Sequence, residues 1–307
     1  MLTAFVFPGQ ASQYVGMGRD LWENYPLAQE VFNEADDALG FSLSELCFTG
    51  PEADLQLTTN TQPAILVVSI AAYRVLRSMG ITADYVAGHS LGEYSALVAS
   101  GSLKLAEAVR LVHKRGRYMQ EAVPLGVGAM AAIIGADLAV VAEICQEVAG
   151  NEICSTANLN SPSQAVIAGH KEAVERAIEA LKARKAGKAK MLPVSAPFHC
   201  DLMKPAAERL AVDLAQIEFG NLEIPLVNNI DARIINRSNE VADSLLRQVC
   251  APVLWSASVQ RLIDQGVTRF IEVGPKKVLT GLIKQINNTV KFLNVEDRAT
   301  IESIINS

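Results

Sequence analysis

The sequence predicts an α/β protein: a large domain with a parallel sheet, into which a small ferredoxin-like subdomain is inserted. Short apolar runs rich in β-branched residues alternate with longer segments of helical period, which is typical of a parallel sheet with helices on both faces. Half of the 307 residues are hydrophobic and 20% are charged, a composition that supports a large core and excludes a disordered chain. The middle of the chain follows a different order of elements, β-α-β-β-α-β.

The large domain is predicted from the alternation of strand and helix on either side of that middle part. The N-terminal elements are strands at 3–7 and 85–88 and helices at 20–39, 62–79, 91–100 and 105–122. Two later apolar runs, 224–228 and 269–273, are predicted to add strands to the same sheet. Strands joined by helical crossovers pair in parallel, because each connection must return across the sheet.

The middle of the chain predicts a separate small sheet. Its expected strands are 128–135, 152–157, 164–168 and 189–194, its helices are 138–148 and 172–184, and a turn is expected at 160–163. This is the β-α-β-β-α-β order of ferredoxin-like units. We therefore expect residues 127–195 to form the small subdomain and residues 1–126 and 196–307 to form the large catalytic subdomain.

Charge and cysteine content narrow the class of protein. With 27 Lys+Arg against 33 Asp+Glu, the net charge of −6 argues against a nucleic-acid or anionic-membrane binder. No apolar run reaches the roughly eighteen residues that span a bilayer, and the N-terminal MLTAFVFPGQ lacks the basic region of a signal peptide. The scattered cysteines, without CxxC spacing, predict a reducing compartment and no zinc site; they are Cys47, Cys145, Cys154, Cys200 and Cys250. We therefore expect a cytoplasmic protein without a metal or redox cofactor, in which Cys200 is a buried, inert thiol.

The segment 88–92 (GHSLG) carries a G-x-S-x-G pattern between an expected strand and an expected helix. Such a turn is sharp, and glycine at 88 and 92 removes side chains that would collide. The Ser90 hydroxyl then lies at a helix N-terminus, where N–H groups and the helix dipole favour a developing oxyanion. The pattern predicts a nucleophile; the alternative is an ordinary glycine-flanked loop with a serine N-cap.

A serine nucleophile needs a base, and the chain has four histidines: His89, His113, His170 and His199. His199 follows the small subdomain in an irregular segment, and loops at such junctions line clefts, so it is the best-placed base. His89 adjoins Ser90 but should point away from it, in a structural role. His113, on a polar helix arc, and His170, in a turn, are expected to be solvated.

Arg115 occupies an unusual position on its expected helix. At roughly 100° per residue it is centred on the apolar stripe, within about 40° of Ala108, Leu111, Met119 and Ala122. A buried guanidinium keeps its proton and must be paired. Two interpretations stay open at this point: a structural ion pair with an internal acid, or a fork for the carboxylate of a substrate.

Six ordered motifs resemble those of the malonyl-CoA:acyl carrier protein transacylases, and the resemblance runs from about residue 3 to residue 285. They are 7–13 (FPGQASQ), 88–96 (GHSLGEYSA), 114–120 (KRGRYMQ), 158–164 (NLNSPSQ), 197–199 (PFH) and 272–275 (EVGP). The resemblance implies a hydrolase-like α/β domain with an inserted ferredoxin-like subdomain, in agreement with the pattern above. It also implies a monomer that needs no cofactor.

The resemblance implies a role for each matching residue. Ser90 would attack the thioester, and His199 would act first as general base and then as general acid. Gln248 would orient His199 through its backbone carbonyl, which makes an acidic third member unnecessary; Asp201 and Glu272 are weaker candidates for that task.

The remaining implied roles concern the acyl group. Backbone N–H groups of Gln10 and Leu91 would form the oxyanion hole, and Arg115 would hold the free carboxylate of malonyl. Phe198 resembles the malonyl-type choice, since a smaller residue would admit the α-methyl group of methylmalonyl. Two further implied substrate-binding residues are Met119 and Asn160.

The implied reaction is ping-pong: malonyl-CoA acylates Ser90, CoA leaves, and the phosphopantetheine thiol of acyl carrier protein takes the malonyl group. The carrier is acidic, so a basic docking face is expected. The first candidate is the acid-free run Lys182, Arg184, Lys185, Lys188 and Lys190, with Lys276 and Lys277 as others. A solvated helix end is the alternative explanation of that run.

Three other functions fit parts of the pattern. The nearest is a serine thioesterase or carboxylesterase, against which Arg115 and Gln10 count because hydrolysis requires neither. A second is a non-catalytic module that binds carrier protein or CoA. The third is a stand-alone acyltransferase that serves a polyketide synthase in trans, rather than fatty-acid synthesis.

Overall fold

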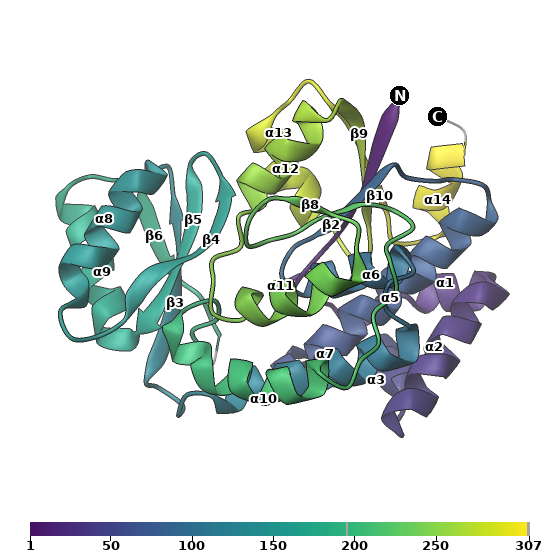
Figure 1. Cartoon of the computed structure of the whole chain (residues 1–307), viewed down its shortest axis with the longest axis horizontal. Helices are drawn as coiled ribbons and strands as arrows, with labels where there is room; N and C mark the ends of the chain where they lie inside the picture. The colour runs from purple at the N-terminus through teal and green to yellow at the C-terminus, as the bar shows by residue number, and fades with distance from the viewer. Residues whose placement is uncertain (195, 306–307) are drawn as a thin grey trace.

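The computed structural model of the protein describes residues 1–194 and 196–305. Its main sheet has the strand order β10-β9-β1-β2-β7-β8 (Figure 1). The strands are β1 (Leu2–Phe7), β2 (Tyr85–Gly88), β7 (Leu226–Val227), β8 (Ile234–Ile235), β9 (Val267–Val273) and β10 (Lys291–Val295). All neighbours pair in parallel except β7 and β8. The predicted α/β class with a parallel sheet is confirmed.

The central strand β1 shows why the sheet is covered on both faces. Phe5 and Phe7 point into one core cluster, whereas Ala4 and Val6 point into another, as the two-residue period of a strand requires. The first face carries helices α2 (Pro26–Leu39), α5 (Thr58–Ser78), α6 (Leu91–Ala99) and α7 (Leu105–Glu121). The second carries α12 (Trp255–Asp264) and α13 (Val278–Ile286). Both layers are visible around β1 in Figure 1.

A second, antiparallel sheet of order β4-β5-β3-β6 lies beside the first (Figure 1, teal). Its elements are β3 (Gly128–Ile134), α8 (Leu138–Ala149), β4 (Cys154–Ser161), β5 (Gln164–His170), α9 (Lys171–Ala183) and β6 (Lys188–Met191). The two helices pack on this sheet around a hydrophobic cluster of their own. The division of the chain at residue 127 stays a prediction, and its other predicted limits, at residues 195 and 307, lie outside the described residues.

Several helix predictions near the N-terminus were wrong in their limits. The single helix expected at 20–39 is two, α1 (Arg19–Asn24) and α2, because Pro26 forces Tyr25 into an extended conformation. The short helices α3 (Leu43–Thr49) and α4 (Glu52–Gln56) were not predicted. Helix α5 begins at Thr58, four residues before the expected start.

The strand limits differ as well. β4 extends through Ser161, which pairs with Gln164, so the turn is confined to residues 162–163 and Asn160 lies in a strand rather than in the expected turn. β6 and β7 are shorter than predicted.

The remaining elements are η1 (Asp201–Met203), α10 (Lys204–Leu214), η2 (Ser238–Glu240), α11 (Val241–Gln248) and α14 (Arg298–Ile305). Among the described helices, none combines the length and apolar character needed to cross a membrane.

Candidate active site

Ser90 lies on a sharp turn between β2 and α6. Its backbone has φ 51° and ψ −102°, a conformation that L-residues rarely adopt. A Cβ on Gly88 would lie 1.9 Å from the carbonyl oxygen of Gly92, and a Cβ on Gly92 would lie 2.0 Å from that of Phe7. Only glycine fits at both positions. The Ser90 side chain makes no capping bond to α6, so the simple N-cap interpretation is wrong.

His199 lies against the serine. Its Nε2 is 2.7 Å from Ser90 Oγ, and its Nδ1 is 2.8 Å from the backbone carbonyl oxygen of Gln248, at the end of α11. A carbonyl oxygen only accepts, so Nδ1 carries the proton and Nε2 is free to accept from the serine hydroxyl. The three groups thus have the geometry of a nucleophile, a base and an orienting group.

The electrostatic surroundings keep this imidazole neutral. His199 is 4% exposed, and burial lowers its pKa to about 3, with the positive charge of Arg115 as the next cause. A neutral ring is the form that can take a proton from Ser90.

Neither acidic candidate for orienting His199 has that role in the structure. Asp201 is exposed and pairs with Lys204 at 2.8 Å. Glu272 is buried, and its two oxygens accept the N–H groups of Leu279 and Thr280 at the start of α13. The carbonyl of Gln248 takes their place.

Arg115 reaches the same point from α7. Its guanidinium, 1% exposed, donates from Nη1 to Gln62 Oε1 at 2.8 Å and from Nη2 to Gln248 Oε1 at 2.9 Å and Ser90 Oγ at 3.1 Å. Within the described part of the chain no carboxylate lies at ion-pair distance, so the structural ion pair considered above is not present. The cation is held by neutral groups beside the nucleophile. Its helix approaches α5 closely because residue 116 is glycine: a Cβ there would lie 2.5 Å from the carbonyl oxygen of Thr58.

The two expected oxyanion donors are available. Among the hydrogen bonds of residues 1–194 and 196–305, none uses the backbone N–H of Gln10 or Leu91. The Gln10 side chain donates instead to Thr58 Oγ1 at 3.3 Å. By contrast, the backbone N–H of Ser90 is occupied, since it donates to Asn229 Oδ1 at 2.7 Å.

The three remaining residues expected to contact substrate are all buried. Phe198 is buried next to His199. Asn160 Oδ1 is 2.8 Å from Nε2 of His89, so its amide holds the structural histidine. Met119 is buried, and its sulfur lies 3.8 Å from the amide nitrogen of Gln62, the residue that accepts a hydrogen bond from Arg115.

The other two histidines are less exposed than the sequence predicted. His113 is half-buried with its ring 5.8 Å from that of Phe41, and burial lowers its pKa. His170 belongs to β5 rather than to a turn, and its Nδ1 accepts the N–H of Ile153 at 2.9 Å. Cys200 is buried as expected, and burial raises its pKa to about 12.

Sequence reasoning missed four polar residues around the site: Gln62, Glu93, Asn229 and Ser244. All are buried. Only Glu93 carried a signal in the sequence, because it is a charged residue in the otherwise uncharged, largely apolar segment of α6. Gln62 follows the polar residues 58–61 at the start of α5 and does not stand out there. Nothing in the local sequence distinguishes Asn229 or Ser244.

The basic run near the end of α9 is partly neutralised. Arg184 pairs with Glu143 and Glu147 of α8, and Lys182 lies 4.0 Å from Glu179. The exposed lysines of this run without an ion pair in the described ranges are Lys185, Lys188 and Lys190. Lys276 donates to the carbonyl of Ala11, and Lys277 is exposed.

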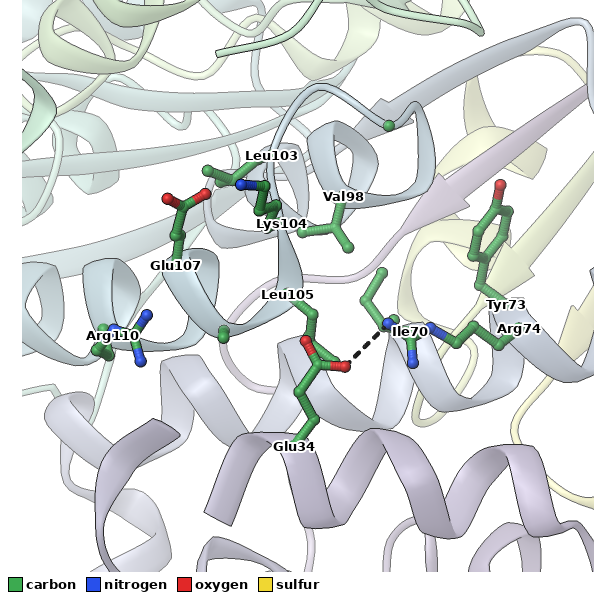
Figure 2. A pocket seen from close by; sticks show the side chains of 12 residues that line it. Glu34, Ile70, Tyr73, Arg74, Val98, Leu103, Lys104, Leu105, Glu107 and Arg110 are labelled. Atoms are coloured by element: carbon green, nitrogen blue, oxygen red, sulfur yellow. Dashed lines mark hydrogen bonds and ion pairs between the residues drawn. The ribbon is translucent and has the colours of Figure 1, made fainter. Parts of the chain in front are cut away.

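A separate groove of about 580 Å³ lies between α2, α5 and α7 (Figure 2). Its lining includes the ion pair of Glu34 and Arg74, together with Lys104, Glu107 and Arg110. None of the residues described above lines it. The candidate catalytic groups Ser90, His199 and Arg115 converge outside this groove.

Comparison with known proteins shows which family this chain resembles. The model of the acyl transferase domain family matches residues 4–304. The malonyl CoA-acyl carrier protein transacylase of Escherichia coli K12 is 54% identical over 288 residues, 94% of this chain and 93% of that protein. Its counterpart in Bacillus subtilis 168 is 46% identical over 304 residues, 98% of this chain and 96% of that protein.

Two solved structures have the same high structural similarity to this chain. The malonyl CoA-acyl carrier protein transacylase of Coxiella burnetii has a TM-score of 0.97 at 44% identity, over 100% of this chain and 97% of its own. A malonyl-transacylase in complex with a type II polyketide acyl carrier protein has a TM-score of 0.97 at 48% identity, over 100% and 99%. Fold, elbow and family match define an acyltransferase. Within that class, this chain belongs to the malonyl CoA-acyl carrier protein transacylase family.

Proposed function

We propose that this protein transfers the malonyl group from malonyl-CoA to the phosphopantetheine thiol of acyl carrier protein, in support of fatty-acid synthesis. The observation that carries the proposal is the buried guanidinium of Arg115, 3.1 Å from Ser90 Oγ and without a carboxylate partner in the described residues. A cation that lies beside a nucleophile and lacks a counter-ion favours an acyl group that brings its own carboxylate.

In the first half-reaction Ser90 Oγ attacks the thioester carbonyl while His199 Nε2 takes the hydroxyl proton. The N–H groups of Gln10 and Leu91 stabilise the oxyanion. The C–S bond then breaks, and His199 gives its proton to the departing sulfur, so CoA leaves as the thiol and the imidazole is neutral again. The product of this step is a malonyl ester on Ser90.

In the second half-reaction the phosphopantetheine thiol gives its proton to His199 and attacks the ester. Collapse of the tetrahedral intermediate breaks the C–O bond and returns the proton to Ser90. Protons pass through one imidazole, and backbone N–H groups stabilise the negative charge on the oxyanion, so the proposed chemistry calls for neither a metal nor a redox cofactor.

Arg115 is proposed to act on selectivity in two ways. It exchanges neutral partners for the malonyl carboxylate, which an acetyl group cannot offer. Its charge also depresses the pKa of His199, and a bound carboxylate offsets that charge, so the base becomes stronger when malonyl is present. Phe198 is proposed to limit space at the α-carbon, with Met119 and Asn160 supporting the acyl pocket from behind.

The proposed partner is acyl carrier protein, and Lys185, Lys188 and Lys190 remain the proposed basic contact. Nucleic acid and membrane are not among the proposed partners. We propose that the protein is cytoplasmic, because its scattered free cysteines favour a reducing compartment. We also propose that it is a monomer, as the family resemblance implies. A polyketide carrier is the second candidate acceptor, because one of the similar structures is a complex with such a carrier.

The test is a transfer assay with malonyl-CoA and carrier protein bearing phosphopantetheine. Malonyl-carrier should form with the wild-type protein and disappear with Ser90→Ala. Ser95→Ala is the matched control, since Ser95 lies buried in the same helix with a hydroxyl that has no partner in the described structure. Release of malonate without transfer would instead identify a hydrolase, and equal activity of Ser90→Ala would refute the catalytic assignment.

A further inference from the structure

Glu93 is a buried carboxylate in the first turn of α6, three residues after Ser90. It is 1% exposed and makes no ion pair with any described residue. Its Oε2 accepts from Gln248 Nε2 at 2.7 Å and from the backbone N–H of Asn229 at 3.1 Å. Its Oε1 faces the hydroxyl of Ser244 at 3.4 Å. Burial of a carboxyl group without an ion pair costs free energy, so we ask what Glu93 contributes at this position.

The Gln248 side chain lies between this carboxylate and Arg115. Its Nε2 donates to Glu93, and its Oε1 accepts from Arg115 Nη2 at 2.9 Å. A carboxylate at the amide nitrogen and a guanidinium at the amide oxygen fix the direction of the amide, because a flip would make both contacts repulsive. The same residue offers its backbone carbonyl to His199 Nδ1.

Asn229 extends the arrangement to the nucleophile itself. Its Oδ1 accepts the N–H of Ser90 at 2.7 Å, and its Nδ2 donates to the carbonyl of Gly88 at 2.6 Å. Gln248 Nε2 also lies 3.1 Å from the carbonyl oxygen of Ser90. One carboxylate therefore receives donors from the two residues that hold the strained turn.

We propose that Glu93 is a positioning residue for acyl transfer, which fixes Gln248 and, through it, both the base His199 and the carboxylate fork Arg115. This inference rests on the proposed function for the reaction that Glu93 serves, whereas the contacts of Glu93 are independent of that proposal. Glu93 touches no reacting atom. Its contribution is to keep the distance between nucleophile and base, and the direction of the fork, at their productive values.

The geometry also says which property of Glu93 matters. Oε2 already receives two N–H donors, so it acts as an acceptor whether or not a proton sits on Oε1, on the side of Ser244. Glutamine at this position keeps an oxygen acceptor at the same distance along the side chain. It loses the charge, and it replaces the oxygen that faces the Ser244 hydroxyl with an NH2 donor, from which that hydroxyl can accept. Aspartate keeps the charge but withdraws the acceptor by one methylene. An acceptor role predicts that Gln works better than Asp, whereas a purely electrostatic role predicts the opposite.

The experiment compares Glu93→Gln, Glu93→Asp and the control Glu107→Gln, a partly buried carboxylate in the separate groove of Figure 2. Single-turnover acylation by malonyl-CoA should fall about 100-fold in Glu93→Asp and less than about tenfold in Glu93→Gln, because displacements of about 1 Å carry penalties of that size. The preference for malonyl-CoA over acetyl-CoA should also fall in Glu93→Asp, since Arg115 loses its fixed acceptor. Melting temperatures show that the variants compared are folded.

Two readouts do not depend on malonyl transfer. Labelling of Ser90 by a fluorophosphonate reports on the serine and its base, and the Nδ1–H proton resonance of His199 reports on the bond to Gln248. Both should be perturbed in Glu93→Asp and preserved in Glu107→Gln. Folded Asp and Gln variants equal to wild type in both, or Asp better than Gln, would overturn the inference. Failure of the wild-type protein to form malonyl-serine would instead overturn the proposed function and leave these two readouts valid.

Discussion

Replacement of Arg115 by alanine should remove the selectivity of this protein for malonyl-CoA while leaving its acylation chemistry in place. In the structure the guanidinium donates to the neutral acceptors Gln62, Gln248 and Ser90. A malonyl carboxylate should take over two of these donors, so that two bonds from the guanidinium to neutral acceptors are exchanged for two bonds between opposite charges.

The size of the effect follows from that exchange. Hydrogen bonds of charged groups contribute about 1.5–3 kcal/mol each. A bond from a guanidinium to a neutral acceptor lies near the low end of this range and a bond to a carboxylate near the high end, so two exchanges favour malonyl by about 2.5 kcal/mol. At about 1.4 kcal/mol per factor of ten, this is roughly a 60-fold loss in kcat/KM for malonyl-CoA. Acetyl-CoA lacks the carboxylate for this contact. Burial is the main cause of the low pKa of His199, and removal of the Arg115 charge relieves the smaller part of the shift, so acylation by acetyl-CoA should hold or rise.

The assay is stopped-flow acylation of Ser90 with malonyl-CoA and acetyl-CoA in parallel, with Arg117→Ala as the matched control. Arg117 is an exposed arginine on the same helix and should leave both rates unchanged. An equal loss for the two acyl groups in Arg115→Ala would mean that Arg115 supports the fold of the site rather than the carboxylate, and the reasoning would fail.

Three further predictions address the turn, the base and the acyl pocket. Gly88→Ala should lower the free energy of unfolding in urea by about 3 kcal/mol or more, because the added Cβ would lie 1.9 Å from the backbone of Gly92. The control Gly281→Ala, whose Cβ would have nothing within 4 Å, should change it little. Equal effects of the two substitutions would contradict the account. Fluorophosphonate labelling of Ser90 should keep its rate as pH falls from 7 to 5, because burial holds the pKa of His199 below its ordinary 6.5, and a midpoint near 6.5 would disprove this. Stability should behave differently from reactivity, because the contribution of His199 to the free energy of unfolding is fully present above pH 6.5 and is lost as pH falls from 6.5 toward 3. Phe198→Ser should raise acylation by methylmalonyl-CoA about tenfold or more relative to malonyl-CoA, as expected when room for one methyl group is created, and an unchanged ratio would exclude Phe198 from that role.

The sequence was informative where one residue type alone satisfies a local constraint. The glycines at 88 and 92 predicted the turn because no side chain fits there, and Arg115 on an apolar stripe predicted a buried cation. The break before Pro26 could have been predicted from the same kind of local rule, and was missed.

What the sequence could not provide is contact between residues far apart in the chain. Asn229 reaches Ser90 across 139 positions, and Gln248 reaches Glu93 across 155. Nothing in the residues beside Asn229 indicates that its amide holds the elbow. The resemblance to a family supplied the role of the Gln248 backbone carbonyl, whereas the role of its side chain between two charges emerged only from the folded arrangement.

The most direct test of the central claim is the intact mass of the protein a few seconds after mixing with malonyl-CoA. We expect the mass of one malonyl group on Ser90, absent in Ser90→Ala, weaker in Arg115→Ala, and discharged on addition of acyl carrier protein. No adduct from any acyl-CoA, or an adduct that survives in Ser90→Ala, would contradict the assignment of this site.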